Sequence, residues 1–170
     1  MRHGVSLDKL PKDDIKYAMR DLMDKAKSLY ESDEHQWMLD QIELLRANKY
    51  EAIDHGSLLQ YLTEMTIRDR RELGSRLAVL LQHLLKYLIQ PERASGSWAA
   101  TVVDQQAEIK DMLTETPSLN SYAPGLFVKA YPRAVRSASA ETGIARAKFP
   151  SSCPWTMQET LAYEPPTNSG

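Results

Sequence analysis

Residues 68–89 read RDRRELGSRLAVLLQHLLKYLI and hold the longest apolar stretch of the 170-residue chain. Seven leucines recur there at helical steps, so apolar side chains cover most of the circumference of a helix. The stretch is interrupted by Gln82, His83 and Lys86 and is too short to cross a bilayer. We therefore expect a buried central helix around which the other segments pack.

The composition of the whole chain also favours helices over strands. Leucine and alanine number 38, whereas valine and isoleucine, whose branched side chains lose rotamer freedom in a helix, number 13. No segment alternates as a half-buried strand does. We predict an all-α fold, a compact bundle of about six helices, with residues 28–163 forming a single domain.

An amphipathic helix is predicted from Pro11 to Tyr30, and residues 1–27 are predicted to form a helical extension that precedes the domain. Its apolar residues recur at three- and four-residue steps. They are Ile15, Met19, Leu22, Ala26 and Leu29. This stripe would dock on another protein or a second copy of the chain, or else pack onto the bundle as an extra helix.

Other helix boundaries are predicted from capping residues. A second helix ends near Asn48 after Ser32 and Asp33 have re-capped the chain, and a third begins at Asp54 or at a capping box opening at Ser57. The central helix starts separately, near Arg68. A fifth helix follows the Ser95-Gly96-Ser97 turn and ends at Thr116-Pro117.

The C-terminal third is predicted to be less regular. Pro124 and Pro132 fall inside what would otherwise be one helix ending at Gly143, so we expect a broken or kinked element there. Residues 156–159 fit a capping box for a short last helix, and residues 164–170 look like a disordered tail.

Charge and cysteine content limit the classes of function. Twenty-one Lys and Arg against twenty-three Asp and Glu give a net charge of −2, which provides no global attraction to nucleic acid or anionic lipid. A single cysteine, Cys153, suits a reducing compartment, and residues 1–14 lack the apolar region of a secretory signal. We expect a cytoplasmic protein without a membrane segment.

A series of short motifs runs through the chain. The first are Leu29-Tyr30-Glu31-x-Asp33 with Trp37, and Leu44-Leu45-Arg46. The central ones are Ser75-Arg76-Leu77, His83-Leu84-Leu85-Lys86, Gln90-Pro91-Glu92-Arg93 and Ser97-Trp98-x-x-Thr101. The last are Pro117-Ser118-Leu119, Glu141-Thr142-Gly143 and Phe149-Pro150-x-x-Cys153-Pro154. In this order they resemble the cyanobacteria-rich domain-of-unknown-function family 29, over residues 29 to about 163.

The resemblance implies an all-helical fold and carries no established activity. The third helix of that family usually carries several glutamates, where this chain has Gln60, Tyr61 and Thr63 and keeps Glu64. If those carboxylates hold a metal in relatives, this chain has lost them. We expect no cofactor and no metal.

The polar strip of the central helix is the first candidate site. His83 could act as a general base or metal ligand, but Arg76 and Lys86 would lower its pKa and repel a cation. Gln90, Glu92, Arg93 and Trp98 continue this site into the following turn. The structural interpretation is a half-buried histidine, a helix-capping turn and an aromatic core anchor, with an enzyme centred on His83 as the alternative.

Two further sets of residues are interpreted structurally. Asp104, Glu108, Asp111 and Glu115 recur on one helix face, which indicates a solvated surface more than a cation site. Cys153 has no histidine nearby in sequence, so we interpret it as a small packing residue rather than a nucleophile.

Basic residues concentrate in two segments. The first holds Arg68, Arg70, Arg71 and Arg76, and the second holds Lys129, Arg133, Arg136, Arg146 and Lys148. The second set is a candidate nucleic-acid-binding face, because three of its members share one side of a helix. Glu72 lies four residues from both Arg68 and Arg76, where helical ion pairs would neutralise these arginines.

No phosphate-binding glycine loop, zinc pattern or nucleophile elbow occurs in the sequence. We therefore expect a non-enzymatic helical interaction or regulatory module, antitoxin-like, whose N-terminal helix binds a protein partner or forms a homo-oligomer. The alternative is a nucleic-acid-binding regulator or nuclease-like protein that uses the basic C-terminal face.

Overall fold

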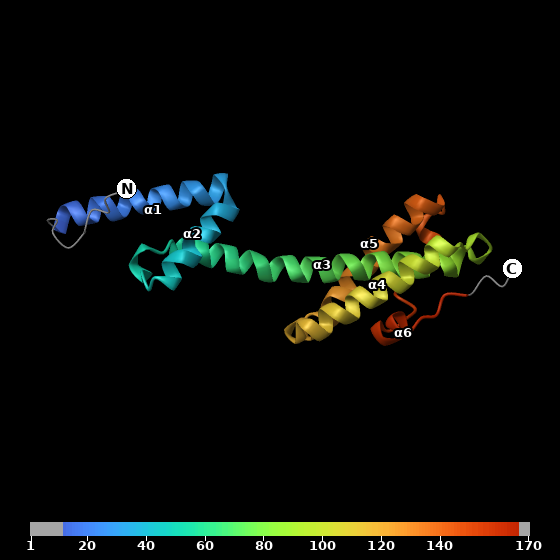
Figure 1. Ribbon diagram of the computed structural model, residues 1–170. Helices are drawn as coiled ribbons and strands as arrows, with labels where there is room; N and C mark the ends of the chain where they lie inside the picture. The colour runs from blue at the N-terminus through green and yellow to red at the C-terminus, as the bar shows by residue number, and fades with distance from the viewer. Residues whose placement is uncertain (1–11, 167–170) are drawn as a thin grey trace. The chain divides into compact units, whose positions relative to one another are not determined.

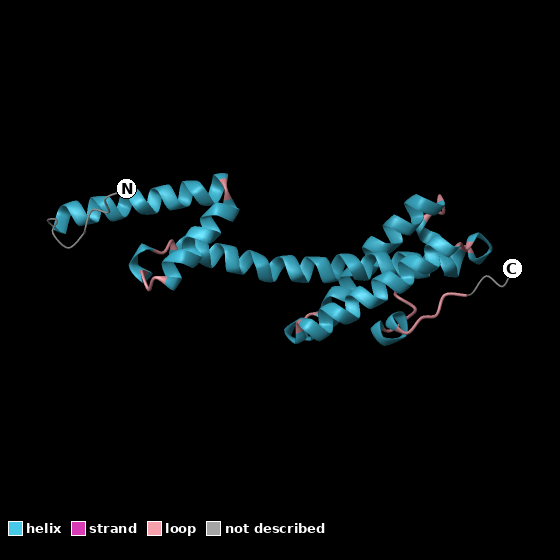
Figure 2. Cartoon of the chain, viewed as in Figure 1, coloured by secondary structure: helices cyan, strands magenta, loops and turns pink. Residues whose placement is uncertain are grey.

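The computed structural model describes residues 12–166, with the side chains of residue 17 and of residues 20–166. Within these residues the chain is all-α, as predicted: six α-helices and four short 3-10 helices are present, and no strand (Figures 1 and 2). None of these helices combines the length and the apolarity needed to cross a membrane. The chain packs as two compact units, and the boundary between them falls between Glu64 and Met65.

This boundary falls inside α3 (His55–Ile89), a single helix of 35 residues. The prediction of two separate helices there is wrong. No proline or glycine lies between residues 57 and 73, so nothing interrupts the backbone hydrogen bonds, and Gly74 is tolerated in the helix interior. The predicted domain boundary after residue 27 differs from the boundary between the two units and stays a prediction.

The first unit begins with α1 (Lys12–Ser32) and α2 (Glu34–Arg46). Asp33 separates them, and its Oδ1 accepts a hydrogen bond from the Gln36 amide at 3.0 Å, so the predicted re-capping is confirmed. α2 ends close to the predicted position, and Asn48 follows in the left-handed region with φ 54°. The predicted start at Pro11 lies outside the described residues.

Trp37 is the centre of the first unit. Its side chain is fully buried, and its ring lies 4.7 Å from the Tyr30 ring and 5.8 Å from the Tyr61 ring. These contacts join α1, α2 and the start of α3, because each helix supplies one of the three rings.

Asp54 caps α3. Its Oδ1 accepts a hydrogen bond from the Ser57 amide at 3.1 Å, and its own amide donates to Gln41 Oε1 at 2.9 Å. The alternative capping box at Ser57 does not form, because the Gln60 side chain donates along the helix to Glu64 instead.

The second unit packs α4 (Gly96–Glu115), α5 (Ala123–Thr142) and the short α6 (Met157–Leu161) around the C-terminal half of α3 (Figure 1). Of the seven leucines predicted to cover the central helix, Leu88 is 47% exposed and the other six lie in the core. These six are fully buried: Leu73, Leu77, Leu80, Leu81, Leu84 and Leu85.

The side chains along α3 give the directions of its neighbours. Arg76 pairs with Glu108 of α4, whereas Lys86, further along α3, lies against Trp98, which precedes Glu108 on α4. The helix α4 therefore runs opposite to α3. A Cβ on Gly74 would lie 3.5 Å from Leu126 of α5, and Lys86 pairs with the later residue Glu141. α5 therefore runs in the same direction as α3.

α5 is one helix, so the predicted break in the C-terminal third is wrong. Pro124 occupies the first turn, where its missing amide has no helical acceptor to lose. Pro132 lies inside the helix on an exposed side, and Val128, whose carbonyl it leaves without a donor, is 71% exposed. Gly143 ends the helix in the left-handed conformation with φ 75°, as predicted.

The capping box of α6 is confirmed. Thr156 Oγ1 accepts a hydrogen bond from the Glu159 amide, and the Glu159 carboxylate accepts one from the Thr156 amide. The buried Gln106 of α4 holds the helix in place, since its Nε2 donates to the Thr160 and Tyr163 carbonyls at 3.0 and 2.8 Å. Residues 167–170 of the predicted tail lie outside the described residues.

Candidate functional site

Lys86 and Trp98 of the predicted polar site meet in the second unit. The Lys86 side chain is 7% exposed, and its Nζ donates to Glu141 Oε2 at 2.6 Å. Nζ also lies 4.2 Å from the centroid of the Trp98 ring, within the range of a cation–π contact. Gln82 Nε2 donates to the other oxygen of Glu141 at 2.5 Å. We call Gln82, Lys86, Trp98 and Glu141 the lysine cluster.

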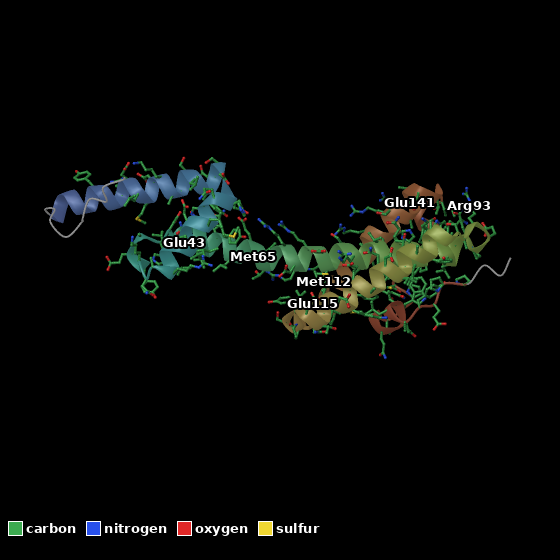
Figure 3. All side chains as sticks on the ribbon, in the orientation of Figure 1. Glu43, Met65, Arg93, Met112, Glu115 and Glu141 are labelled. Atoms are coloured by element: carbon green, nitrogen blue, oxygen red, sulfur yellow. The ribbon has the colours of Figure 1, made fainter. Side chains whose placement is uncertain are left out.

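The lysine cluster keeps the Glu141 carboxyl ionised. Partial burial acts to raise the pKa of this carboxyl, but the hydrogen bond and charge of Lys86, with the hydrogen bond from Gln82, outweigh it. The pKa of Glu141 therefore lies below its usual value. Figure 3 labels Glu141 on α5 and Arg93 beyond α3, toward one end of the second unit.

His83 lies next to the lysine cluster and is half-buried. Its Nδ1 donates to the Val79 carbonyl of its own helix at 3.0 Å. Burial lowers the pKa of the imidazole and the charge of Lys86 adds to this effect, while the Val79 carbonyl and Glu141 act in the opposite direction. The net effect favours a neutral imidazole, and His83 does not line the groove between α3 and α5 that is described below.

The remaining residues of the predicted polar site do not join the lysine cluster. Arg76 pairs with Glu72 at 2.8 Å and Glu108 at 3.1 Å, away from Lys86. Gln90 precedes the 3-10 helix η3 (Pro91–Arg93), and its carbonyl accepts from the Arg93 amide. Glu92 and Arg93 are exposed.

Two sequence interpretations concern possible cation or thiol chemistry. Glu108, one of the four acidic residues that recur on one face of α4, forms an ion pair with Arg76. Among the described side chains, no group of three His, Cys, Asp or Glu residues lies close enough together to hold a metal ion. Burial raises the pKa of the half-buried Cys153 thiol, which packs against the core. A thiol that is protonated at neutral pH is a weak nucleophile.

A groove of about 900 Å³ lies between α3 and α5. Four basic side chains line it, Arg70 and Arg71 from α3 and Lys129 and Arg133 from α5, and none of its twelve lining residues is acidic. We call it the basic groove. The other lining residues are Ile67, Gly74, Ser75, Ser121, Tyr122, Gly125, Leu126 and Ala130.

The basic groove joins parts of the two basic segments that lie about 60 residues apart in the sequence. Lys129 and Arg133 of the predicted nucleic-acid face belong to it, whereas Arg136 lies about one turn further along α5. Arg146 and Lys148 are exposed on the 3-10 helix η5 (Arg146–Lys148) and do not line the groove. Local sequence patterns predict neither the basic groove nor the pairing of Lys86 with Glu141, because both depend on the direction in which α5 packs against α3.

The first unit carries most of the exposed apolar side chains. Among the described side chains, fourteen large apolar ones are exposed, and nine of these lie between residues 17 and 62, although this unit is the smaller one. On α1 they are Tyr17, Leu22 and Met23, on α2 Leu39, Ile42 and Leu45, after α2 Tyr50, and on α3 Leu59 and Leu62. We call these nine residues the apolar surface.

Comparison with known proteins identifies one family. Residues 29–164 match the family described as a domain of unknown function, DUF29. No curated protein matches the chain, and no solved structure matches it. The match covers four fifths of the chain and agrees with the range over which the motifs resemble this family, from residue 29 to about 163. The chain therefore belongs to the DUF29 family.

Proposed function

We propose that the first unit is a protein-interaction module through which two copies of the chain associate. The observation that carries the proposal is the apolar surface, nine exposed large side chains of which eight lie on the three helices that share one small aromatic core. Large contiguous apolar patches on a protein surface usually mark binding sites.

The part of α1 whose side chains are described has an apolar stripe that the first unit covers only partly. Leu22 is 51% exposed, whereas Ala26 and Leu29 of the same stripe are half-buried. α1 thus packs partly against α2 near Tyr30 and leaves part of its stripe uncovered. Ile15 and Met19 of the predicted stripe have no described side chains.

The charge of α1 permits a second copy as the partner. Its sequence contains five Lys or Arg and five Asp or Glu, so two such helices carry no net charge and do not repel each other. Isologous dimers are the commonest assemblies of soluble proteins, because the same surface serves both subunits. Burying the exposed half of each leucine would contribute about 1 kcal/mol, so several must act together.

The oligomeric state of the full chain tests this proposal. Sedimentation velocity between about 1 and 100 µM, where moderately tight dimers dissociate, is expected to show a concentration-dependent dimer. A Leu22→Glu/Leu39→Glu variant should remain monomeric, because each glutamate would be buried without a partner. Val103→Glu/Val128→Glu is the matched control, since both valines are exposed in the second unit.

Circular dichroism must first show that both double variants keep their helix content. The proposal fails if the unmodified chain is monomeric at the highest concentration. It also fails if the control dissociates the dimer as effectively as the changes at Leu22 and Leu39.

A further inference from the structure

We propose that the basic groove binds single-stranded nucleic acid, holding the phosphates with its cations and one base against Tyr122. The proposal concerns the second unit alone and is independent of the association proposed for the first unit.

The charge balance of the groove is the first argument. No ion pair with a described carboxylate forms at Arg70, Arg71, Lys129 or Arg133, and no acidic residue lines the groove. Two other basic residues of α3 in this unit do form ion pairs: Arg76 pairs with Glu72 and Glu108, and Lys86 pairs with Glu141. Unneutralised cations are therefore gathered on a chain whose net charge is −2, which localises a polyanion to the groove.

The shape of the groove favours a chain of phosphates over a single one. Its volume of about 900 Å³ far exceeds that of one phosphate. Lys129, Arg133 and Arg136 follow at steps of four and three residues on α5, a row about 10 Å long at the helical rise. A row of this length, of which Lys129 and Arg133 line the groove, can contact more than one phosphate of an extended single strand.

Tyr122 gives the groove an aromatic face. The Tyr122 side chain is 47% exposed, and the Arg70 guanidinium lies 4.9 Å from its ring centroid. Arg70 is itself fixed, since its Nε donates to the Thr66 carbonyl at 3.0 Å. Unpaired bases stack on tyrosine rings and on guanidinium planes, whereas the bases of a duplex are already stacked on each other.

The direction of α5 adds a further positive potential. Tyr122 precedes the first residue of this 20-residue helix, and Gly125 in its first turns lines the groove. The positive end of the helix dipole therefore lies beside the cations and favours an anion there.

Fluorescence anisotropy of a labelled oligothymidylate of about twelve nucleotides, a typical site size for single strands, tests the proposal. Binding should weaken with salt, with a slope of log K against log salt of about −2 to −3 for three or four neutralised phosphates. Lys129→Glu/Arg133→Glu should weaken binding at least about tenfold at low salt. The matched control is Arg93→Glu/Lys110→Glu, which changes the charge equally at exposed positions outside the groove.

A second pair of variants distinguishes binding in the groove from a general attraction by surface charge. A Cβ at Gly125 meets no atom within 4 Å, so Gly125→Leu keeps α5 intact and places a side chain in the groove. This neutral change should weaken binding, whereas Gly96→Leu, at a helical glycine with equally open surroundings, should leave it unchanged.

The role of the Tyr122 ring is tested separately. Tyr122→Ala should weaken binding about fivefold or more, and Tyr122→Phe should retain it.

Three results would overturn the proposal. The first is the absence of salt-dependent binding to the oligothymidylate. The second is an equal loss in the groove variant and in its charge-matched control. The third is equal or tighter binding of a duplex or of polyglutamate, since either would show a general affinity for anions. The sedimentation readout for the first unit is unaffected by any of these outcomes.

Discussion

Lys86 Nζ lies 2.6 Å from Glu141 Oε2, and this ion pair joins the C-terminal half of α3 to the last turn of α5. The two partners differ in exposure, since the Lys86 side chain is 7% exposed and that of Glu141 is 49% exposed. Removal of the glutamate therefore leaves a buried cation, while removal of the lysine leaves a carboxylate that water can reach.

Glu141→Ala is expected to lower the free energy of unfolding by about 2–4 kcal/mol, because Lys86 loses its buried charge partner. A double variant, Lys86→Met/Glu141→Gln, should be more stable than Glu141→Ala, since it removes both charges and keeps the apolar stem. Urea denaturation followed by circular dichroism measures both. Glu92→Ala is the control, because Glu92 is exposed and in no described ion pair. A loss at Glu141 no larger than the loss at Glu92 would contradict the expected role.

The stability of the chain should fall as the solution is acidified. The folded chain lowers the pKa of His83 from 6.5 and that of Glu141 from 4.5, so it binds protons less readily than the unfolded chain. The stabilisation by each group is complete above its unfolded pKa and is lost as the pH falls through the folded value. Melting temperatures between pH 8 and pH 5 should therefore decrease below about 6.5.

His83→Gln should flatten this decrease, since glutamine does not titrate. His35 is exposed on α2, and His35→Gln serves as the control. Identical pH profiles for His83→Gln and the unmodified chain would show that the decrease has another origin. A separate loss below pH 4.5 should disappear in Glu141→Gln.

Trp37 should dominate the stability of the first unit. Trp37→Ala is expected to cost about 3–5 kcal/mol, because it removes a fully buried ring and both aromatic contacts. Trp37→Phe should cost clearly less, since Trp37 Nε1 has no hydrogen-bond partner to lose. Hydrogen exchange would localise the effect: amides of α1 and α2 should exchange faster in Trp37→Ala, while those of α4 keep their rates. Equal costs for the two substitutions would refute this account.

The two prolines of α5 should respond differently to replacement by alanine. Pro132→Ala is expected to raise the free energy of unfolding by about 1–3 kcal/mol, because it restores an amide donor for the Val128 carbonyl. Pro124→Ala should change it by less than about 0.5 kcal/mol, because Pro124 is in the first turn. Thermal denaturation of both variants provides the test, and a larger gain at Pro124 than at Pro132 would contradict it.

Local patterns predicted most of the helices correctly. The leucines of residues 73–85 are buried as their spacing indicated, and the caps at Asp33, Gly143 and Thr156 form where the residue types favoured them. The errors came from reading local signals as breaks. A separate helix was expected to start near Arg68 although α3 runs through this position, and Pro124 and Pro132 looked like breaks although α5 contains both.

The periodicity of the sequence did not predict which helices pack against each other. Glu141 and Gln82 were not predicted as neighbours of Lys86, because their pairing requires α3 and α5 to run in the same direction. The same direction brings Arg70 and Arg71 to Lys129 and Arg133. Hydrophobic spacing indicates which face of a helix is buried, but it carries no information on which helix covers that face.

The attachment of α6 has a consequence for the lifetime of the protein. Gln106 holds α6 through two backbone carbonyls, and Tyr131 Oη donates to the Pro150 carbonyl at 2.7 Å in the loop before it. Proteolytic loss of the chain after this loop would leave the buried Gln106 amide without acceptors and uncover α4. We therefore expect loss of the C-terminal segment up to Tyr163 to make the second unit less stable and easier to degrade, and affinity tags belong beyond it.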